Sequence, residues 1–160
     1  VLSGVPVEEV TGIGSIIPPE RVRRKIELIR RGIDINRPDP ADAMDVLAKV
    51  GGPELGAMAG LMLGGASLRL PVVLDGFIAG AAAAIAVGLR PELRAMLIGS
   101  HSSAEPGHRI LLRTLNIPTY FDFGMCLGEG TGAALLFPVI DAAVRILTEM
   151  PTLGELDIRR

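Results

Sequence analysis

Three short apolar segments, each followed by a loop and then by a helical pattern, constrain the fold of this chain more than any other feature. They cover residues 71–76, 95–101 and 118–124. Short apolar, β-branched or aromatic runs that end in turn residues are typical of buried strands. Strands that alternate with helices form right-handed βαβ units. The sequence therefore predicts an α/β fold, a parallel sheet flanked by helices in a Rossmann-like three-layer arrangement.

Proline, glycine and helical spacing of apolar residues place the helices around this sheet. Pro18-Pro19-Glu20 is interpreted as the start of the first helix, and Asp39-Pro40 as the N-cap and first turn of the second. The segment before them, residues 5–15, is expected to be a loop. The expected helices are 19–32, 40–50, 54–68, 77–88, 105–115 and 131–150.

Three unusual loops follow the three predicted strands. They are Asp75-Gly76, residues 100–106 and residues 124–132. Because ligands bind outside the carboxyl ends of parallel strands, we expect these loops to crowd one edge of the sheet around a small-molecule site.

The third loop carries one carboxylate, Glu129, between Gly128 and Gly130 at the start of the last helix. Glycines there are understandable if a ligand approaches the main chain closely. A helix N-terminus would offer unpaired N–H groups and a positive dipole end. We interpret Glu129 as a general base in a closed, glycine-lined pocket, where desolvation would raise its basicity. The alternative is that it only complements the helix dipole.

The second loop, residues 100–108, contains three serines and two histidines. A metal site of His101, His108 and Cys126 lacks the usual ligand spacing, and a Ser–His nucleophile lacks the glycine-flanked elbow. Anion binding by serine hydroxyls and main-chain N–H groups is favoured, with Ser103 as a candidate. Ordinary serine turns in a capped loop would explain the same pattern.

Two further features are weaker. Gly12, Gly14 and Lys25 place glycines near one lysine, but they fit neither the phosphate-loop pattern nor the dinucleotide pattern. Lys25 alone would ordinarily be a surface residue. Asp75 ends a predicted strand, where capping of the helix that follows is the default role, and orienting a loop or contacting a ribose are the alternatives.

Composition limits the remaining function classes. The chain has 160 residues, a formal net charge of −2 and a pI near 5.7, which gives no basic footprint for nucleic acid. A single cysteine, Cys126, excludes an internal disulfide and fits a cytoplasmic setting. The apolar run 76–89 is too short to span a bilayer, so no membrane partner is expected.

Since the chain opens at Val1 in the middle of a pattern, we expect residues 1–160 to be the C-terminal portion of a longer domain, with its N-terminal half absent.

Taken together, these segments resemble the C-terminal half of the nicotinate-nucleotide–dimethylbenzimidazole phosphoribosyltransferase family. The most specific motifs are Ser-His-Ser-Ser-Ala-Glu-Pro-Gly-His at 100–108 and Leu-Gly-Glu-Gly-Thr-Gly-Ala at 127–133. The resemblance covers nearly the whole chain and includes residues 50–54, 71–77, 122–125 and 147–150. Gly12-Ile13-Gly14 and Lys25 are weaker matches, by order and approximate spacing.

The resemblance implies transfer of the phosphoribosyl group of nicotinate mononucleotide to 5,6-dimethylbenzimidazole, giving α-ribazole 5′-phosphate and nicotinate for cobalamin biosynthesis. It implies a homodimer, a small helical domain beside the sheet, and no metal or cofactor. Glu129 would be the catalytic base, and Leu127 would line the base pocket. The 5′-phosphate would be held by Gly14, Lys25 and Ser103, and Gly128, Gly130 and Asp75 would complete the substrate-binding residues.

The chain departs from the family pattern in three places. Cys126 stands where the family usually has arginine, the first glycine loop reads Thr-Gly-Ile-Gly at 11–14, and the N-terminal half is missing. Two alternatives therefore stay open. One is a non-catalytic or half-site subunit that needs a partner chain, and the other is a different phosphate- or nucleotide-binding α/β domain.

Overall fold

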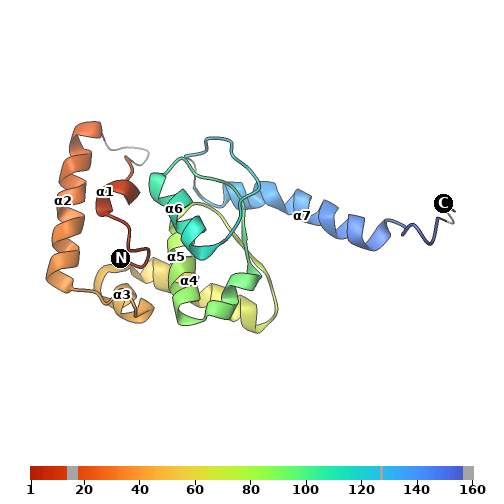
Figure 1. Ribbon diagram of the computed structural model, residues 1–160, viewed down its shortest axis with the longest axis horizontal. Helices are drawn as coiled ribbons and strands as arrows, with labels where there is room; N and C mark the ends of the chain where they lie inside the picture. Colours follow the sequence, from red (N-terminus) through yellow and green to blue (C-terminus); the bar gives the residue numbers. More distant parts are fainter. Residues whose placement is uncertain (14–17, 127, 157–160) are drawn as a thin grey trace.

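A computed structural model describes residues 1–13, 18–126 and 128–156. The body of the molecule holds the sheet and most of the helices, and one long helix projects from it toward the C-terminus (Figure 1). In chain order the elements are α1 (Val7–Val10), α2 (Pro19–Asn36), α3 (Ala43–Val50), α4 (Pro53–Ser67), β1 (Val72–Leu74), α5 (Phe77–Leu89), the 3-10 helix η1 (Pro91–Met96), β2 (Leu97–Gly99), α6 (Pro106–Leu115) and α7 (Thr131–Glu149).

The expected parallel sheet flanked by helices is confirmed. Strands β1 and β2 pair in parallel, with Val73 opposite Ile98, and α5 with η1 connects them. The third predicted strand, 118–124, is wrong as a strand, because it contributes one isolated parallel bridge between Phe121 and His101. The N–H groups of Tyr120 and Phe121 both donate to the Ser100 carbonyl, so the backbone turns there and cannot continue a ladder.

The hydrophobic core is centred on α5. Ala82, Ala83 and Ala86 are fully buried, and their small side chains let the neighbouring helices approach closely. Leu74 of β1 and Leu97 of β2 are buried in the same cluster. The other buried members come mainly from α4, η1 and α6, namely Ala59, Met62, Ala84, Ile85, Leu93, Leu111, Leu112, Leu115 and Ile117. Alanine and leucine thus replace aromatic residues as the packing material of this core.

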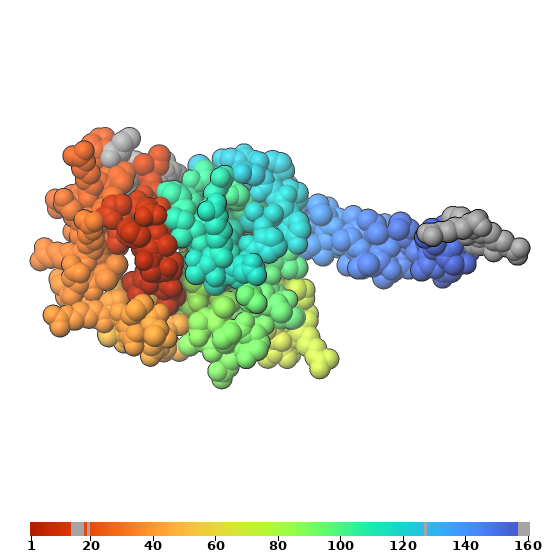
Figure 2. Space-filling model, in the orientation of Figure 1, coloured from red at the N-terminus to blue at the C-terminus, as the bar shows by residue number. Residues whose placement is uncertain are grey.

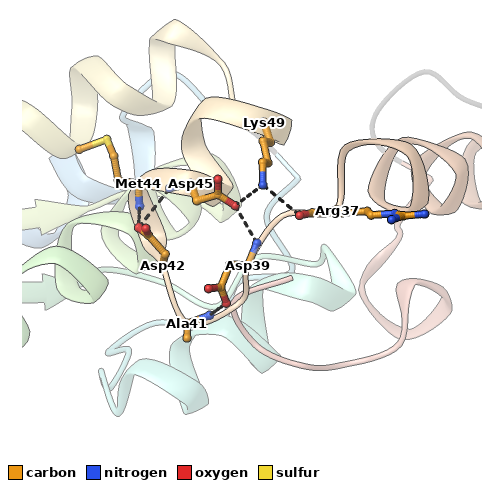
Figure 3. A network of polar contacts seen from close by, with 7 residues as sticks. All are labelled: Arg37, Asp39, Ala41, Asp42, Met44, Asp45 and Lys49. Carbon is orange, nitrogen blue, oxygen red and sulfur yellow. Dashed lines mark hydrogen bonds and ion pairs between the residues drawn. The ribbon is translucent and has the colours of Figure 1, made fainter.

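A network of aspartates explains where α3 begins (Figure 3). The sequence-based N-cap at Asp39 is wrong, since Asp42 is the cap and its carboxylate accepts the N–H groups of Met44 and Asp45. Asp39 instead accepts the N–H of Ala41, which closes a turn before the helix. The Asp39 N–H group and then Lys49 hold the pKa of the Asp45 carboxyl below its ordinary value. These contacts fix the corner between α2 and α3.

The prediction of a loop over residues 5–15 is wrong at Val7–Val10, because these four residues form α1, a single helical turn. Glu8 of α1 forms an ion pair with Arg30 of α2. The backbone of α1 also lies against α6, where a β-carbon on Gly107 would meet the Val10 carbonyl oxygen at 2.8 Å. The turn therefore places residues 10–12 beside the loop that precedes α6.

Helix α7 is apolar but scarcely covered. In Figures 1 and 2 it extends from the body as an arm. Gly132 and Leu136, near its start, are its buried residues, whereas Leu147 is 85% exposed. By length and composition the helix is apolar enough to cross a membrane, a property that core helices of water-soluble proteins share. Asp141 and Arg145 lie in its middle, and charges there are costly in a bilayer.

Candidate functional site

The predicted site residues that the structure describes line one cleft of about 790 Å³. Lys25 comes from α2, Asp75 from the end of β1, and Ser103 from the loop after β2. Gly128, Glu129 and Gly130 come from the loop before α7. Gly14 and Leu127 lie outside the described residues. Segments separated by more than a hundred positions in sequence are thus brought to one edge of the sheet, as the loop pattern predicts.

Asp75 fastens the loop of Glu129 to the sheet. Its carboxylate accepts the N–H groups of Gly130 at 3.1 Å, Gly132 at 2.8 Å and Ala133 at 3.3 Å. The default expectation that Asp75 caps the helix directly after it is therefore wrong, because it caps α7 from across the sheet edge. A carboxylate at a helix N-terminus satisfies unpaired donors and complements the helix dipole.

The expectation that the α7 N-terminus offers unpaired N–H groups to a ligand is also wrong for its first turn. Besides the groups held by Asp75, the N–H of Thr131 lies 3.5 Å from the Gly128 carbonyl oxygen. The N–H of Ala134 donates to Gly130 at 2.9 Å. The glycines here serve the tight loop, and Gly130 has a left-handed backbone with φ of 81°.

Glu129 lies at the rim of the cleft with its backbone in the left-handed region, at φ of 66°. This conformation is unfavourable for a residue with a β-carbon. Residues held in this way cluster at functional sites. The expectation of a closed pocket around Glu129 is wrong for this chain, since the residue is exposed. Desolvation of its carboxylate therefore needs a cover that these residues do not supply.

Lys25 is half-buried at the other side of the cleft and differs from an ordinary surface lysine. Its Nζ donates to the Gly12 carbonyl oxygen at 2.9 Å. Gly12 is buried against the carboxylate of Glu105, which a β-carbon at Gly12 would overlap. The lysine and Glu105 thus both contact Gly12, and the lysine brings a positive charge to the cleft.

The Ser103 loop is tied to the third loop and to a buried imidazole. The N–H of Ala104 donates to the Met125 carbonyl at 3.0 Å, and the Ser103 hydroxyl lies 3.5 Å from the same oxygen. The N–H of Ser103 donates to Nδ1 of His108 at 2.9 Å. Burial, then the neighbouring His101, lower the pKa of His108 to about 4. The imidazole of His108 is therefore neutral at pH 7.

The histidines do not form the metal site that their sequence leaves open. Cys126 is an exposed free thiol, while His101 and His108 are buried. Within the described ranges, no group of three or more histidine, cysteine, aspartate or glutamate side chains is placed to hold a metal ion.

Sequence reasoning missed the apolar part of the cleft lining. It consists of side chains of α1, α2 and α5 together with the chain start: Val1, Val5, Val7, Val10, Ile29, Ile33, Phe77 and Ile78. Helical spacing of Ile29 and Ile33 was the signal available, but it does not tell a core-facing position from a cleft-facing one. A cleft that combines apolar side chains with a few polar groups suits an aromatic ligand that carries an anionic group.

Comparison with known proteins gives a consistent result. The family model described as "Phosphoribosyltransferase" matches residues 1–158. A relative from Desulforamulus reducens, named nicotinate-nucleotide–dimethylbenzimidazole phosphoribosyltransferase, is 52% identical over 158 residues, which is 99% of this chain and 45% of the relative. A protein of the same name from Escherichia coli is 48% identical, over 98% of this chain and 44% of its own length.

The solved structures agree. Crystalline CobT from Thermus thermophilus is similar to this chain with a TM-score of 0.92 and 42% identity, over 99% of this chain and 47% of that protein. The chain thus spans about half the length of the relatives it matches, which is consistent with the expected part of a larger fold. It belongs to the phosphoribosyltransferase family that the matching model describes.

Proposed function

We propose that this chain supplies the Glu129 side of a nicotinate-nucleotide–dimethylbenzimidazole phosphoribosyltransferase site. The observation that carries the proposal is the single cleft that gathers Glu129, Lys25 and Ser103, the residues to which the family resemblance assigns the base and the phosphate contacts. Metal and cofactor chemistry are not needed for this reaction. The free thiol of Cys126 suits a reducing compartment, and we place the protein in the cytoplasm.

In this reaction Glu129 takes the N–H proton of the benzimidazole while the other ring nitrogen attacks C1 of the ribose. The bond between C1 and the pyridinium nitrogen breaks, and its electron pair stays with nicotinate. Because attack comes from the face opposite nicotinate, the configuration at C1 inverts to α. The pyridinium is already a good leaving group, so positioning and one proton removal are the main tasks.

The binding roles combine the family resemblance with the lining of the cleft. The resemblance assigns the 5′-phosphate to Gly14, Lys25 and Ser103, and the apolar side chains of the lining accept an aromatic ring. The family resemblance assigns Gly128 and Gly130 to substrate binding and Leu127 to the base pocket. Asp75 acts by fixing the loop that carries Glu129, through its bonds to Gly130 and Gly132.

A complete site requires further protein. Glu129 is exposed, and the apolar residues Leu135, Phe137, Val144, Ile146 and Leu147 of α7 are between 48% and 85% exposed. An apolar helix of this length is stable in water when another surface covers it. We propose that the remaining half of the fold, or a second copy in a homodimer, covers α7 and closes the cleft.

The same incompleteness supports a second candidate, a half-site subunit that binds the nucleotide without turnover. Cys126 lines the cleft close to Glu129, where the family usually has arginine, and the loss of that positive charge would weaken substrate binding or alter acceptor choice. The two candidates make different predictions for the same assay.

The test is transferase activity with nicotinate mononucleotide and 5,6-dimethylbenzimidazole. The chain is assayed alone and mixed with the remaining half of the Desulforamulus reducens relative. Activity in the mixture supports the proposal, whereas nucleotide binding without activity supports the half-site candidate. Glu129→Gln should keep nucleotide affinity and lower turnover about 10²–10⁴-fold. Near-normal turnover of this variant would remove Glu129 from the base role.

A further inference from the structure

We propose that His108 is a positioning residue that holds Ser103 at the cleft, and that His108 and His101 together tie the Ser103 loop to the loop of Glu129. The inference rests on the proposed function, in which Ser103 contacts the 5′-phosphate of nicotinate mononucleotide. It concerns two side chains to which that function gives no task.

The two imidazoles are among the most buried side chains of the molecule. His101 is 0% exposed and His108 is 1% exposed, and their ring centroids lie 6.0 Å apart. Nε2 of each ring has no hydrogen-bond partner among the described residues. Leaving a buried polar atom unpaired costs free energy that an apolar side chain of similar size would avoid. Histidine at these positions therefore calls for an explanation beyond core packing.

For His108 the explanation is the hydrogen bond that its Nδ1 accepts. It accepts the N–H of Ser103 at 2.9 Å in a buried position. An imidazole nitrogen that accepts a hydrogen bond is unprotonated, so the ring is neutral and carries its proton on Nε2. The Ser103 hydroxyl in turn accepts the N–H of Glu105 at 3.3 Å, which sets the backbone at the start of α6. Nδ1 thus fixes the main chain of the residue whose side chain faces the cleft.

For His101 the explanation is its contact with the start of α7. Gly132 lies so close to the ring that a β-carbon there would overlap it. Nδ1 of His101 lies 3.0 Å from the Ser100 hydroxyl, which also donates to the Asp75 main-chain carbonyl at 3.3 Å. The Asp75 carboxylate then holds Gly130 and Gly132. A continuous set of contacts therefore runs from Ser103 through both imidazoles and Asp75 to the loop of Glu129.

The experiment compares two variants of nearly equal size. His108→Asn keeps an acceptor oxygen near the position of Nδ1, and His108→Leu removes it. We expect His108→Leu to weaken nicotinate mononucleotide binding about 10-fold, the equivalent of one lost hydrogen bond. His108→Asn should bind within about 3-fold of the parent chain on the same scale. In the complemented assay the loss should fall on the KM for the nucleotide, with kcat and the KM for the benzimidazole nearly unchanged.

A second readout does not depend on activity or on folding of the variants. Long-range ¹H–¹⁵N spectra of the parent chain should show His108 with an unprotonated Nδ1 and a proton on Nε2. A protonated Nδ1, or equal nucleotide affinity of the Leu and Asn variants, would overturn the positioning role. If the parent chain binds no nicotinate mononucleotide even in the mixture, the proposed function fails and the nucleotide role of Ser103 fails with it. The spectrum then still decides whether His108 holds the Ser103 backbone.

Discussion

Helices α5 and α7 are both rich in apolar residues, but one is buried and the other is largely exposed. Six residues of α5 are buried, Gly80, Ala82, Ala83, Ala84, Ile85 and Ala86, and the helix forms the centre of the core. In α7 the buried residues are Gly132 and Leu136, both in its first two turns. The helix extends from the body of the molecule as an arm (Figure 2). The difference shows that apolar composition predicts only that a helix must bury its surface against other protein. Whether elements of this chain bury it depends on which helices and strands lie next to it.

The point of attachment differs as well. Helix α5 follows β1 directly and is packed along its length by α4, α6 and η1. Helix α7 is fixed at its first turn by the Asp75 carboxylate and by the close contact of Gly132 with His101. The loop that carries Glu129 in the proposed site is therefore held where α7 leaves the body of the molecule. Four experiments test this picture, from the largest expected effect to the smallest.

The first compares two alanines. Ala83 in α5 is 0% exposed, whereas Ala142 in α7 is exposed. Ala83→Leu should lower the free energy of unfolding by about 3 kcal/mol, because the added carbons must displace packed neighbours. Ala142→Leu should change it by less than about 0.5 kcal/mol. Urea denaturation of both variants measures the contrast, and equal effects would mean that α7 is packed against its own chain in solution.

The second removes the attachment of α7. Asp75→Ala deletes the acceptor of three N–H groups and should cost about 2 kcal/mol of unfolding free energy. Hydrogen exchange should accelerate in the first turn of α7 and in residues 128–130 while the amides of α5 stay protected. Unchanged exchange at Gly132 and Ala133 would contradict the capping role of Asp75.

The third fills the contact between α7 and His101. Gly132→Ala should lower the unfolding free energy by about 1–2 kcal/mol, because the new methyl group overlaps the imidazole. Gly64→Ala in α4 is the matched control, since a β-carbon there meets nothing within 4 Å. The control should stabilise the chain by roughly 0.5–1 kcal/mol through helix propensity. Stabilisation by both variants would show that α7 does not rest on His101.

The fourth addresses the uncovered face. Leu147→Glu, at a residue that is 85% exposed, should leave the unfolding free energy of this chain within about 0.5 kcal/mol. It should weaken association with the complementary half, measured by analytical ultracentrifugation or by complemented activity. Association as strong as that of the parent chain would exclude this part of α7 from the interface.

Much of the local structure could be predicted because local physics decides it. The ends of α4, α5 and α6 follow proline and glycine signals, and the predicted bounds agree with the observed helices within one or two residues. The start of α3 could not be predicted, because Asp39 and Asp42 are equally good caps in isolation. The choice depends on the bond from the Asp39 N–H to the Asp45 carboxylate and on the bond from Lys49 to the Arg37 carbonyl, which form only after the chain turns.

For the cleft, too, some features could be predicted from the sequence and others depend on the tertiary structure. The sequence by itself determined that the loops of Asp75 and Ser103 follow paired parallel strands and hence meet at one edge. The loop of Glu129 reaches the same edge after a segment that makes one isolated bridge in place of the predicted third strand. Only the tertiary structure decided that Asp75 caps α7, that His108 lies under Ser103, and that Glu129 is exposed. The order of strands, loops and helices follows from the pattern of neighbouring residues in the sequence. Partners of buried polar groups and the cover of an apolar helix depend on segments far apart in the chain, and these meet only when the fold closes.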